Sequence, residues 1–203
     1  MSLITDKIHI ADFHYGYWIY AAAVIAKEDK EWGSKYSDFI LDLIRDIANP
    51  SQDDKYFPVT RHKDWYMGHS WASGLFEFGG ITIRAIDSFT DLTLPPDDKN
   101  QESTSEAVNA YYAIYLWGLS VGDEFTSNLG RLLLATEIRS SQKYWHMYPE
   151  NFEIYDSVFA KNSVVGVLWS SKVDYTTWFG GKICSFRHFV LTSLLQLMWS
   201  SST

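Results

Sequence analysis

Apolar residues recur every three to four positions along most of the chain, which is the spacing of one face of an α-helix. The pattern predicts four helices, over residues 15–29, 35–50, 105–122 and 124–148. In the second of these, the residues at helix spacing are Phe39, Ile40, Leu43, Ile44 and Ile47. The Asn49-Pro50 pair ends that helix, because proline and the residue before it disfavour helical backbone.

The segment between the second and third helices, 51–74, is rich in turn-forming and aromatic residues and is expected to be a loop. No alternation of strands and helices and no period-two strands are evident, and no repeat of fixed period is found. The sequence therefore predicts a mainly α fold, in which short loops pair the helices and functional residues lie in the loops.

Two segments do not follow the helical pattern. Residues 80–98 contain β-branched residues and a Pro-Pro pair but no helical period. Residues 181–203 contain no acidic residue and end in a serine run. Both are expected to stand apart from the helical part of the chain.

Composition narrows the classes of ligand. The formal net charge of −8 argues against a nucleic acid or an anionic membrane surface as the main partner, because both select for basic patches. The chain has 9 Trp and 13 Tyr, whose rings form flat amphipathic surfaces. A neutral ligand such as a polysaccharide stays compatible with both observations.

Other features exclude some chemistry. The single cysteine, Cys184, allows no disulfide framework within the chain and no zinc site built from thiolates. The histidines form no tight pair or metal motif, and no phosphate-binding glycine loop or serine-nucleophile elbow is found. The N-terminus has no apolar run of signal-peptide length, and the most apolar C-terminal stretch, 189–199, is too short to span a membrane.

Glu102 and Glu106, four residues apart, admit two interpretations. Ser103 and Glu106 form a capping box, which explains Glu106 and leaves Glu102 outside the helix. If Asn100 instead caps an earlier helix, both carboxylates lie on one face. Such a pair, followed by tyrosines, is a plausible sugar site, because glycoside hydrolysis needs one carboxylic acid and one carboxylate.

Polar groups also gather among aromatic residues in three other places. Asp12 and His14 precede the first helix, although an acidic residue at a helix entry is common without any chemistry. The stretch 63–78 combines aromatic residues with Asp64 and His69. The stretch 169–180 has a similar composition, with Lys172, Asp174 and Trp178. Either stretch is a sugar-stacking surface or an ordinary aromatic loop packed on the core.

Together, several long motifs in order resemble glycoside hydrolase family 81, the endo-1,3-β-glucanases. They include FHYGYWIYAAAVIAK, RHKDWYMGHSWASGLFEF, KNQESTSEAVNAYYAIYLWGL, LGRLLLATEIRSSQKYWHM and VVGVLWSSKVDYTTWFG, and they run from Phe13 to Gly180 with one interruption. The resemblance implies that residues 1–180 are part of an α/α barrel catalytic domain, apparently truncated. It also implies that 80–96 are an insertion and that 181–203 are a divergent C-terminal tail.

The implied reaction is the hydrolysis of internal β-1,3-glucosidic bonds of β-1,3-glucan with inversion, without metal or other cofactor. Glu102 corresponds to the family's general base, Glu106 would support it, and His14 matches a motif histidine. The family's general acid lies three residues before Phe13, which here is Ile10. Asp12 is the nearest replacement, although a shift of two extended residues displaces a side chain by about 7 Å. The residues implied to line the cleft are Tyr15, Asp64, Trp65, Tyr66, His69, Trp71, Asn109, Tyr112, Lys172 and Asp174.

The departures from the family pattern leave alternatives open. With isoleucine at the acid position, the chain is either a hydrolase with a substitute acid, a glucan-binding remnant or an inactive fragment. An imperfect gene model with a retained intron accounts for 80–96 and for the tail. The β-sandwich and linking domains that precede the family's barrel are expected upstream, and the family resemblance implies an extracellular or cell-wall location.

Overall fold

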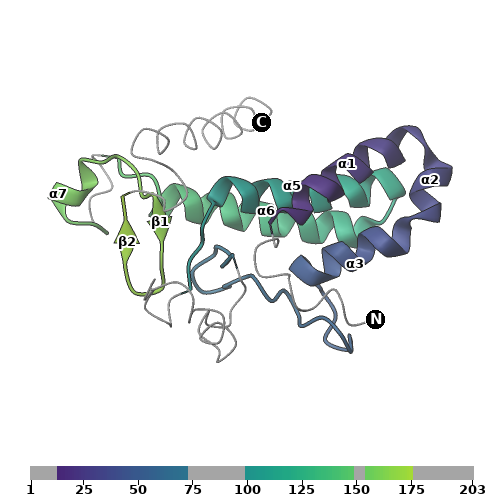
Figure 1. Ribbon diagram of the computed structural model, residues 1–203, viewed down its shortest axis with the longest axis horizontal. Coiled ribbons are helices and arrows are strands. Elements are labelled where there is room, and N and C mark those ends of the chain that lie inside the picture. Colours follow the sequence, from purple (N-terminus) through teal and green to yellow (C-terminus); the bar gives the residue numbers. More distant parts are fainter. Residues whose placement is uncertain (1–12, 73–98, 149–153, 176–203) are drawn as a thin grey trace, which may run out of the picture.

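The computed structural model describes residues 13–72, 99–148 and 154–175. Its elements are α1 (Tyr15–Glu28), α2 (Lys30–Lys35), α3 (Ser37–Ala48), α5 (Thr104–Val121), α6 (Glu124–Tyr144), α7 (Ser157–Ala160), β1 (Val167–Leu168) and β2 (Val173–Asp174) (Figure 1). The prediction of a mainly helical fold is confirmed for these ranges. The segments 80–96 and 181–203, predicted to be an insertion and a tail, lie outside the described residues.

The structure differs from the predicted elements at the C-terminal end of α6. The helix ends at Tyr144 instead of continuing to residue 148. The chain beyond it is drawn into extended pairing, because Met147 N donates to Ser163 O and Val165 N donates to Trp145 O, at 2.9 and 3.0 Å. The antiparallel β1–β2 hairpin was also not predicted, since two-residue strands are too short to show a period.

The long helices α5 and α6 form an antiparallel pair whose backbones approach closely at two glycines (Figure 1). A Cβ on Gly118 would lie 2.3 Å from the Ser127 nitrogen, and one on Gly130 would lie 2.4 Å from the Tyr115 nitrogen. The turn between the helices is short, with Gly122 at φ 76° ending α5 and the Asp123 side chain capping α6. Gly130, which weakens a helix intrinsically, is therefore required by packing.

Helix α1 runs parallel to α5 and packs directly against it. A Cβ on Gly16 would lie 2.5 Å from the Ala110 Cα, and at the other end Lys30 Nζ donates to Ser120 O at 2.6 Å. The core between α1, α3 and α5 is largely apolar, and its fully buried large members include Ile19, Ile47, Ile114 and Trp117. Burial of each such side chain stabilises the fold by about 1.5–3 kcal/mol.

The loop that follows α3 is fixed on that helix by charged side chains. Arg45 Nε donates to Asp54 Oδ2 at 2.7 Å, and Arg61 pairs with Asp46 at 2.9 Å. The buried Asn49 amide donates to Ser51 O at 3.0 Å. This anchoring delivers the segment 62–71 to the C-terminal half of α6. Within the part of the chain that is described, no helix is both long and apolar enough to cross a membrane.

Candidate active site

The segment 99–103, which leads into α5, joins the other parts of the site. Ala72 N donates to Asn100 O and Gln101 N donates to Leu168 O, each at 2.9 Å. Ser170 N donates to Lys99 O at 2.8 Å. The segment is therefore held between the loop 62–72 on one side and the β1–β2 hairpin on the other, and it opens into the first turn of α5.

Glu102 occupies an unusual backbone conformation. Its φ is 60°, and Ser103 N donates across it to Gln101 O at 2.7 Å, which closes a three-residue turn. A γ-turn with positive φ is rare for a residue other than glycine and costs about 1–3 kcal/mol. The alternative in which Asn100 caps the helix and both glutamates share one face is wrong, because α5 begins at Thr104.

Ser103 is the N-cap of α5, as the capping-box interpretation predicts, and its hydroxyl accepts from Glu106 N at 3.4 Å. The Glu106 carboxylate faces α1. Tyr17 Oη donates to Glu106 Oε1 at 3.4 Å, and His14 Nε2 lies 3.5 Å from the same oxygen. The backbone of Glu106 therefore serves the cap, while its carboxylate contacts Tyr17 and His14.

Glu106 and His14 both act electrostatically on Glu102. Burial raises the pKa of Glu102, the negative charge of Glu106 raises it further, and His14 opposes the shift. Burial and the neighbouring Glu106 also raise the pKa of Tyr17, which favours the protonated hydroxyl that donates to Glu106. The structure thus brings Glu102, Glu106 and His14 together, whereas Asp12 and Ile10 lie outside the described residues.

Asp64 organises the loop that carries the predicted aromatic residues. Its Oδ1 accepts from the backbone nitrogens of Tyr66 and Met67 at 3.0 Å, and its Oδ2 accepts from Trp71 Nε1 at 3.1 Å. Burial opposes ionisation, but the hydrogen bonds from Met67, Trp71 and Tyr66 lower the pKa of Asp64. An ionised Asp64 therefore fixes the course of the loop.

The aromatic residues of this loop divide into exposed and buried sets. Trp65 is 53% exposed and Tyr66 is 96% exposed, so both are open to a ligand. His69 is fully buried and Trp71 is 4% exposed. Their rings meet edge to face at 4.6 Å, with His69 also 5.2 Å from the Trp145 ring. His69 and Trp71 pack behind the loop surface, and a direct contact with a ligand would require the loop to move.

Lys172 and Asp174 lie on the β1–β2 hairpin next to the segment 99–103. Lys172 Nζ is 3.4 Å from Asp174 Oδ2 and 4.8 Å from the centre of the Trp169 ring. Trp169 Nε1 donates to the same carboxylate oxygen at 2.8 Å, and Trp169 also pairs with Asn100 in an antiparallel bridge. The three side chains form one partly exposed polar and aromatic unit.

The remaining predicted residues lie on the helices. Tyr15 begins α1 and is partly buried against the main core. Asn109 lies on α5, and its side-chain nitrogen is buried without a hydrogen-bond partner within the described ranges. The Tyr112 ring lies 6.4 Å from the rings of both Tyr20 and Tyr115. These residues therefore lie on α1 and α5, and they differ in how deeply their side chains are buried.

Behind Glu102 lies a buried ionic cluster that sequence reasoning missed. Lys63 and Glu137 are both completely buried, with Lys63 Nζ 3.1 Å from Glu137 Oε2. The Glu137 carboxylate also accepts from Ser70 N at 3.1 Å and from Ser70 Oγ at 3.0 Å. Gln101 Nε2 donates to Glu137 Oε1 at 3.4 Å, which links the cluster to the turn at Glu102.

A signal for this cluster is present in the sequence. Glu137 follows Leu133 and Leu134 at helix spacing, on the stripe that α6 buries. An acidic residue on a buried stripe requires a partner, because an unpaired buried charge is strongly destabilising. The partner, Lys63, lies 74 residues away and was not identifiable from local pattern.

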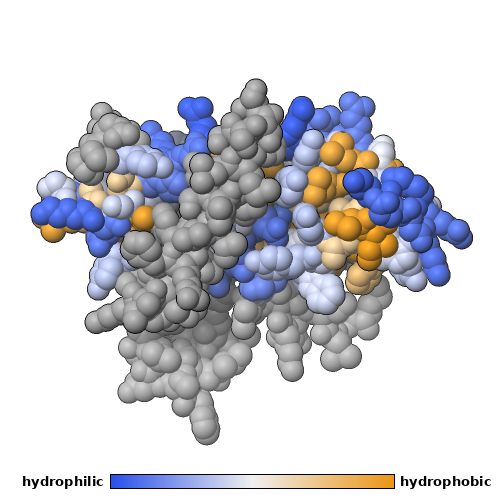
Figure 2. All heavy atoms as spheres, turned by 90° about the horizontal axis from the view of Figure 1, so that it is seen from above, coloured by the Kyte–Doolittle hydropathy of each residue, from blue (hydrophilic) through white to orange (hydrophobic). Residues whose placement is uncertain are grey.

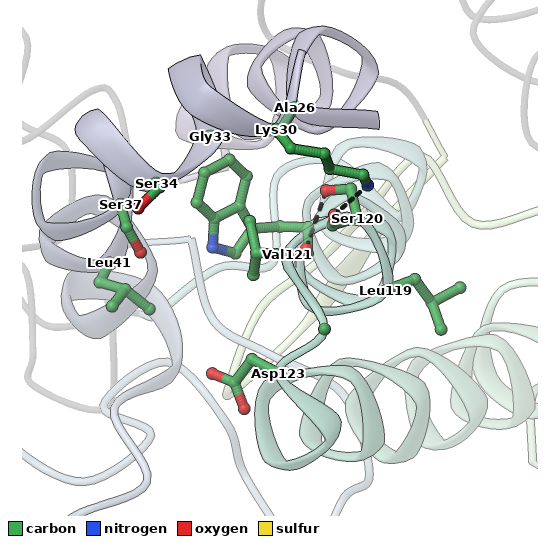
Figure 3. A pocket seen from close by; sticks show the side chains of 12 residues that line it. Ala26, Lys30, Gly33, Ser34, Ser37, Leu41, Leu119, Ser120, Val121 and Asp123 are labelled. Carbon is green, nitrogen blue, oxygen red and sulfur yellow. Dashed lines mark hydrogen bonds between the residues drawn. The ribbon is translucent and has the colours of Figure 1, made fainter. Parts of the chain in front are cut away.

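A hollow of about 570 Å³ lies elsewhere, where α2 meets the end of α5 (Figure 3). Its walls include Lys30, Ser120 and Asp123, with Lys30 directed to the Ser120 carbonyl. Gly122, the C-cap of α5, follows Glu106 by 16 positions, which correspond to about 24 Å along the helix, so the hollow is separate from the glutamates. Among the described residues, no three His, Cys, Asp or Glu side chains are grouped to hold a metal ion.

The amino-acid sequence is similar to that of a known family of glycoside hydrolases over most of its length. The model of the glycosyl hydrolase family 81 C-terminal domain matches residues 9–195. A glucan endo-1,3-beta-D-glucosidase of Arthroderma benhamiae is 37% identical over 171 residues, which are 84% of this chain and 17% of that protein. A protein of the same name from Glycine max is 39% identical over 169 residues, which are 82% of this chain and 23% of that protein.

A solved structure gives the same assignment. A mutant of a glycoside hydrolase family 81 protein from Clostridium thermocellum matches with a TM-score of 0.66 and 34% identity, over 84% of this chain and 21% of that chain. The chain therefore spans about a fifth of the length of the curated relatives that it matches. On the family match, which covers most of its residues, the chain belongs to glycoside hydrolase family 81.

Proposed function

We propose that this chain carries part of the catalytic centre of an endo-1,3-β-glucanase, with Glu102 as the general base. The observation that carries the proposal is the conformation of Glu102, a glutamate held at φ 60° in front of α5 beside a second carboxylate. Strained backbone of this kind persists where the surrounding structure enforces it, and it clusters at active sites. The names of the relatives indicate the bond that is cleaved.

The proposed reaction inverts the anomeric carbon. Glu102 takes a proton from a water molecule, whose oxygen attacks the anomeric carbon, while a carboxylic acid protonates the departing sugar oxygen. The two carboxyl groups must stand roughly 6.5–9.5 Å apart to admit the water. The raised pKa of Glu102 makes it a stronger base than an ordinary glutamate. Asp12 is the proposed acid, in place of the residue that Ile10 replaces.

The neighbours of Glu102 have supporting roles in this proposal. Tyr17 and His14 hold the carboxylate of Glu106, whose negative charge increases the basicity of Glu102. The exposed rings of Trp65 and Tyr66 offer stacking surfaces for sugar rings. On the hairpin, the Lys172–Asp174 pair offers a donor and an acceptor for hydroxyl groups.

We further propose that the helices form part of an α/α barrel. The support is the arrangement in Figure 1, in which α1 returns through α2 and α3, and α5 returns through α6. The parallel packing of α1 on α5 sets the two helical hairpins side by side, as successive repeats of such a barrel require.

The test is the release of reducing ends from a linear β-1,3-glucan by the purified chain, with the anomeric form of the new ends read by NMR. We expect the first products to be α-anomers. The activity should be lost in Glu102→Gln. Glu28→Gln, at an exposed position on α1, is the matched control and should keep it. Asp12→Asn tests the acid. Equal activity of the parent and Glu102→Gln chains would contradict the proposal.

A second function is favoured by Ile10, which cannot protonate a leaving group. In this case the chain binds β-1,3-glucan without cleaving it. Calorimetric titration with a defined β-1,3-linked gluco-oligosaccharide, followed by chromatography of the recovered sugar, separates the two functions. Binding with intact sugar supports the second function, and shortened products support hydrolysis.

A further inference from the structure

The buried carboxylate of Glu137 contacts both the loop 62–71 and the residue that precedes Glu102. It accepts from Ser70 in the loop 62–71 and from the Gln101 side chain, next to Glu102 itself. It also pairs with Lys63, which in turn donates to Gly68 O at 2.7 Å. A single carboxylate on α6 therefore ties together the loop and the residue that begins the turn.

Gln101 connects that carboxylate to the strained backbone. The Gln101 side chain is fully buried and its Nε2 donates to Glu137, while its backbone oxygen accepts from Ser103 N to close the turn. Its backbone nitrogen donates to Leu168 O at 2.9 Å. A turn that costs about 1–3 kcal/mol persists only when its flanking residues are held from several directions. Gln101 is the flanking residue held in this way.

We propose that Glu137 is a positioning residue, which fixes Gln101 and thereby presents the Glu102 carboxylate beside Glu106. Lys63 has the accompanying role of balancing the buried negative charge. This inference rests on the proposed function, because it gives Glu137 a part in presenting the proposed base. Glu137 itself, buried behind the turn, does not touch the substrate.

Two double variants distinguish the role of Glu137 as a hydrogen-bond acceptor from the role of its negative charge. In Lys63→Met/Glu137→Leu, the ion pair and the acceptor are both lost, and the replacements are apolar residues of similar volume, which buried ion pairs commonly tolerate. In Lys63→Met/Glu137→Gln, both charges are lost but an amide oxygen stays available to Ser70 and Gln101. A third variant, Gln101→Met, breaks the link and leaves the ion pair intact.

The readout is the pKa of Glu102, followed by NMR titration of its side-chain carbon in the chain labelled at glutamate and assigned with Glu102→Gln. We expect the pKa to fall toward the ordinary glutamate value in Lys63→Met/Glu137→Leu and in Gln101→Met, and to stay raised in Lys63→Met/Glu137→Gln. Leu133→Ala, which removes buried contacts one turn away on α6, is the control for general loss of stability and should leave the pKa of Glu102 raised.

A pKa of Glu102 that stays raised in folded Gln101→Met would overturn the inference, whatever the double variants do. The titration does not depend on catalysis. Absence of hydrolysis by the parent chain would therefore count against the proposed function and leave the test of Glu137 intact. If the parent hydrolyses glucan, the two link-breaking variants should lower kcat about tenfold or more and leave KM nearly unchanged, with the glutamine double variant restoring kcat.

Discussion

At the scale of single residues, Glu102 lies in a left-handed turn next to Gln101, whose side chain donates to a carboxylate on α6. The role of Glu102 as a base, implied by the family resemblance, stays a prediction, whereas the Ser103 cap followed from the capping box and is confirmed. The left-handed turn was not predictable, because glutamate is not a residue that favours positive φ. Gln101, which begins the turn, donates to Glu137 and Leu168, and a local pattern does not contain these long-range hydrogen bonds.

The raised pKa of Glu102 makes the stability of the chain depend on pH. Because the folded state binds the Glu102 proton more tightly than the unfolded chain, the free energy of unfolding falls as pH rises from the ordinary value of 4.5 to the raised one. Glu102→Gln removes this effect. We expect the variant to be more stable than the parent in urea unfolding at about pH 7, and the difference to disappear near pH 3.5.

The exposed Glu28→Gln exchange serves as the reference for that comparison. It should leave the free energy of unfolding nearly unchanged at both pH values, since exposed charges contribute little. If Glu102→Gln were less stable than the parent near neutral pH, the burial of a disfavoured charge at Glu102 would be refuted.

The hydroxyl of Tyr17 is expected to matter for hydrolysis through Glu106. Tyr17→Phe removes the donor to Glu106 Oε1, an interaction worth about 1 kcal/mol, which corresponds to roughly fivefold in rate. Glucan hydrolysis should fall by that factor. Tyr20→Phe, one turn later on α1, removes the hydroxyl of a ring that lies 6.4 Å from the Tyr112 ring and should change the rate little. Equal losses in the two variants would contradict a specific role for the Tyr17 hydroxyl.

At the scale of elements, the long helices were predictable and their contacts were not. Apolar period gave α1, α3, α5 and α6 with ends within a few residues. The short hairpin escaped prediction because it is held by the segment 99–101 through hydrogen bonds distant in sequence. The close packing of α5 on α6 depends on Gly118 and Gly130, whose effect on the neighbouring helix cannot be seen from their own helix.

Gly130→Ala tests this packing. Alanine favours a helix over glycine by about 1 kcal/mol, which alone would stabilise α6. The added Cβ would lie 2.4 Å from the Tyr115 nitrogen, a backbone atom that cannot move away without shifting α5. We expect a net loss of about 1–3 kcal/mol, measured by urea unfolding.

An alanine-to-glycine exchange on the solvent side of α6 measures the difference in helix propensity between the two residues without the packing effect. Ala135 is exposed, and Ala135→Gly should destabilise by about 1 kcal/mol. A Gly130→Ala chain more stable than the parent would show that α5 and α6 do not meet as closely as described.

At the scale of the whole molecule, the helical bundle leaves apolar faces uncovered in the described ranges. Trp18 is 70% exposed and Ile25 is 44% exposed on one stripe of α1, and Leu132 on α6 is 52% exposed. Figure 2 shows apolar residues gathered beside the hydrophilic end of the bundle. Exposed apolar surface of this kind marks contacts with other protein surfaces. It agrees with a chain that matches about a fifth of the length of its relatives.

We expect the purified chain to self-associate through the α1 stripe. In sedimentation velocity, the weight-average sedimentation coefficient should rise with protein concentration. In Trp18→Lys/Ile25→Lys it should stay at the monomer value, because two charges interrupt the stripe. Glu31→Lys, at an exposed polar position on α2, is the matched change of charge and should associate as the parent does. Concentration-independent sedimentation of the parent would show that the stripe is inert.

The cluster at Glu137 has a consequence for the synthesis of the protein. Gln101 precedes its anchor by 36 positions, and at the usual speed of translation this interval lasts about 2–7 seconds. Throughout that time Glu102 is present in the nascent chain, but the contact between Gln101 and Glu137 cannot form. The interval is longer for Lys63, because its partner Glu137 follows 74 positions later. If Glu137 positions Glu102 as proposed, the Glu102 carboxylate is therefore synthesised early and is oriented only after the second half of α6 has left the ribosome.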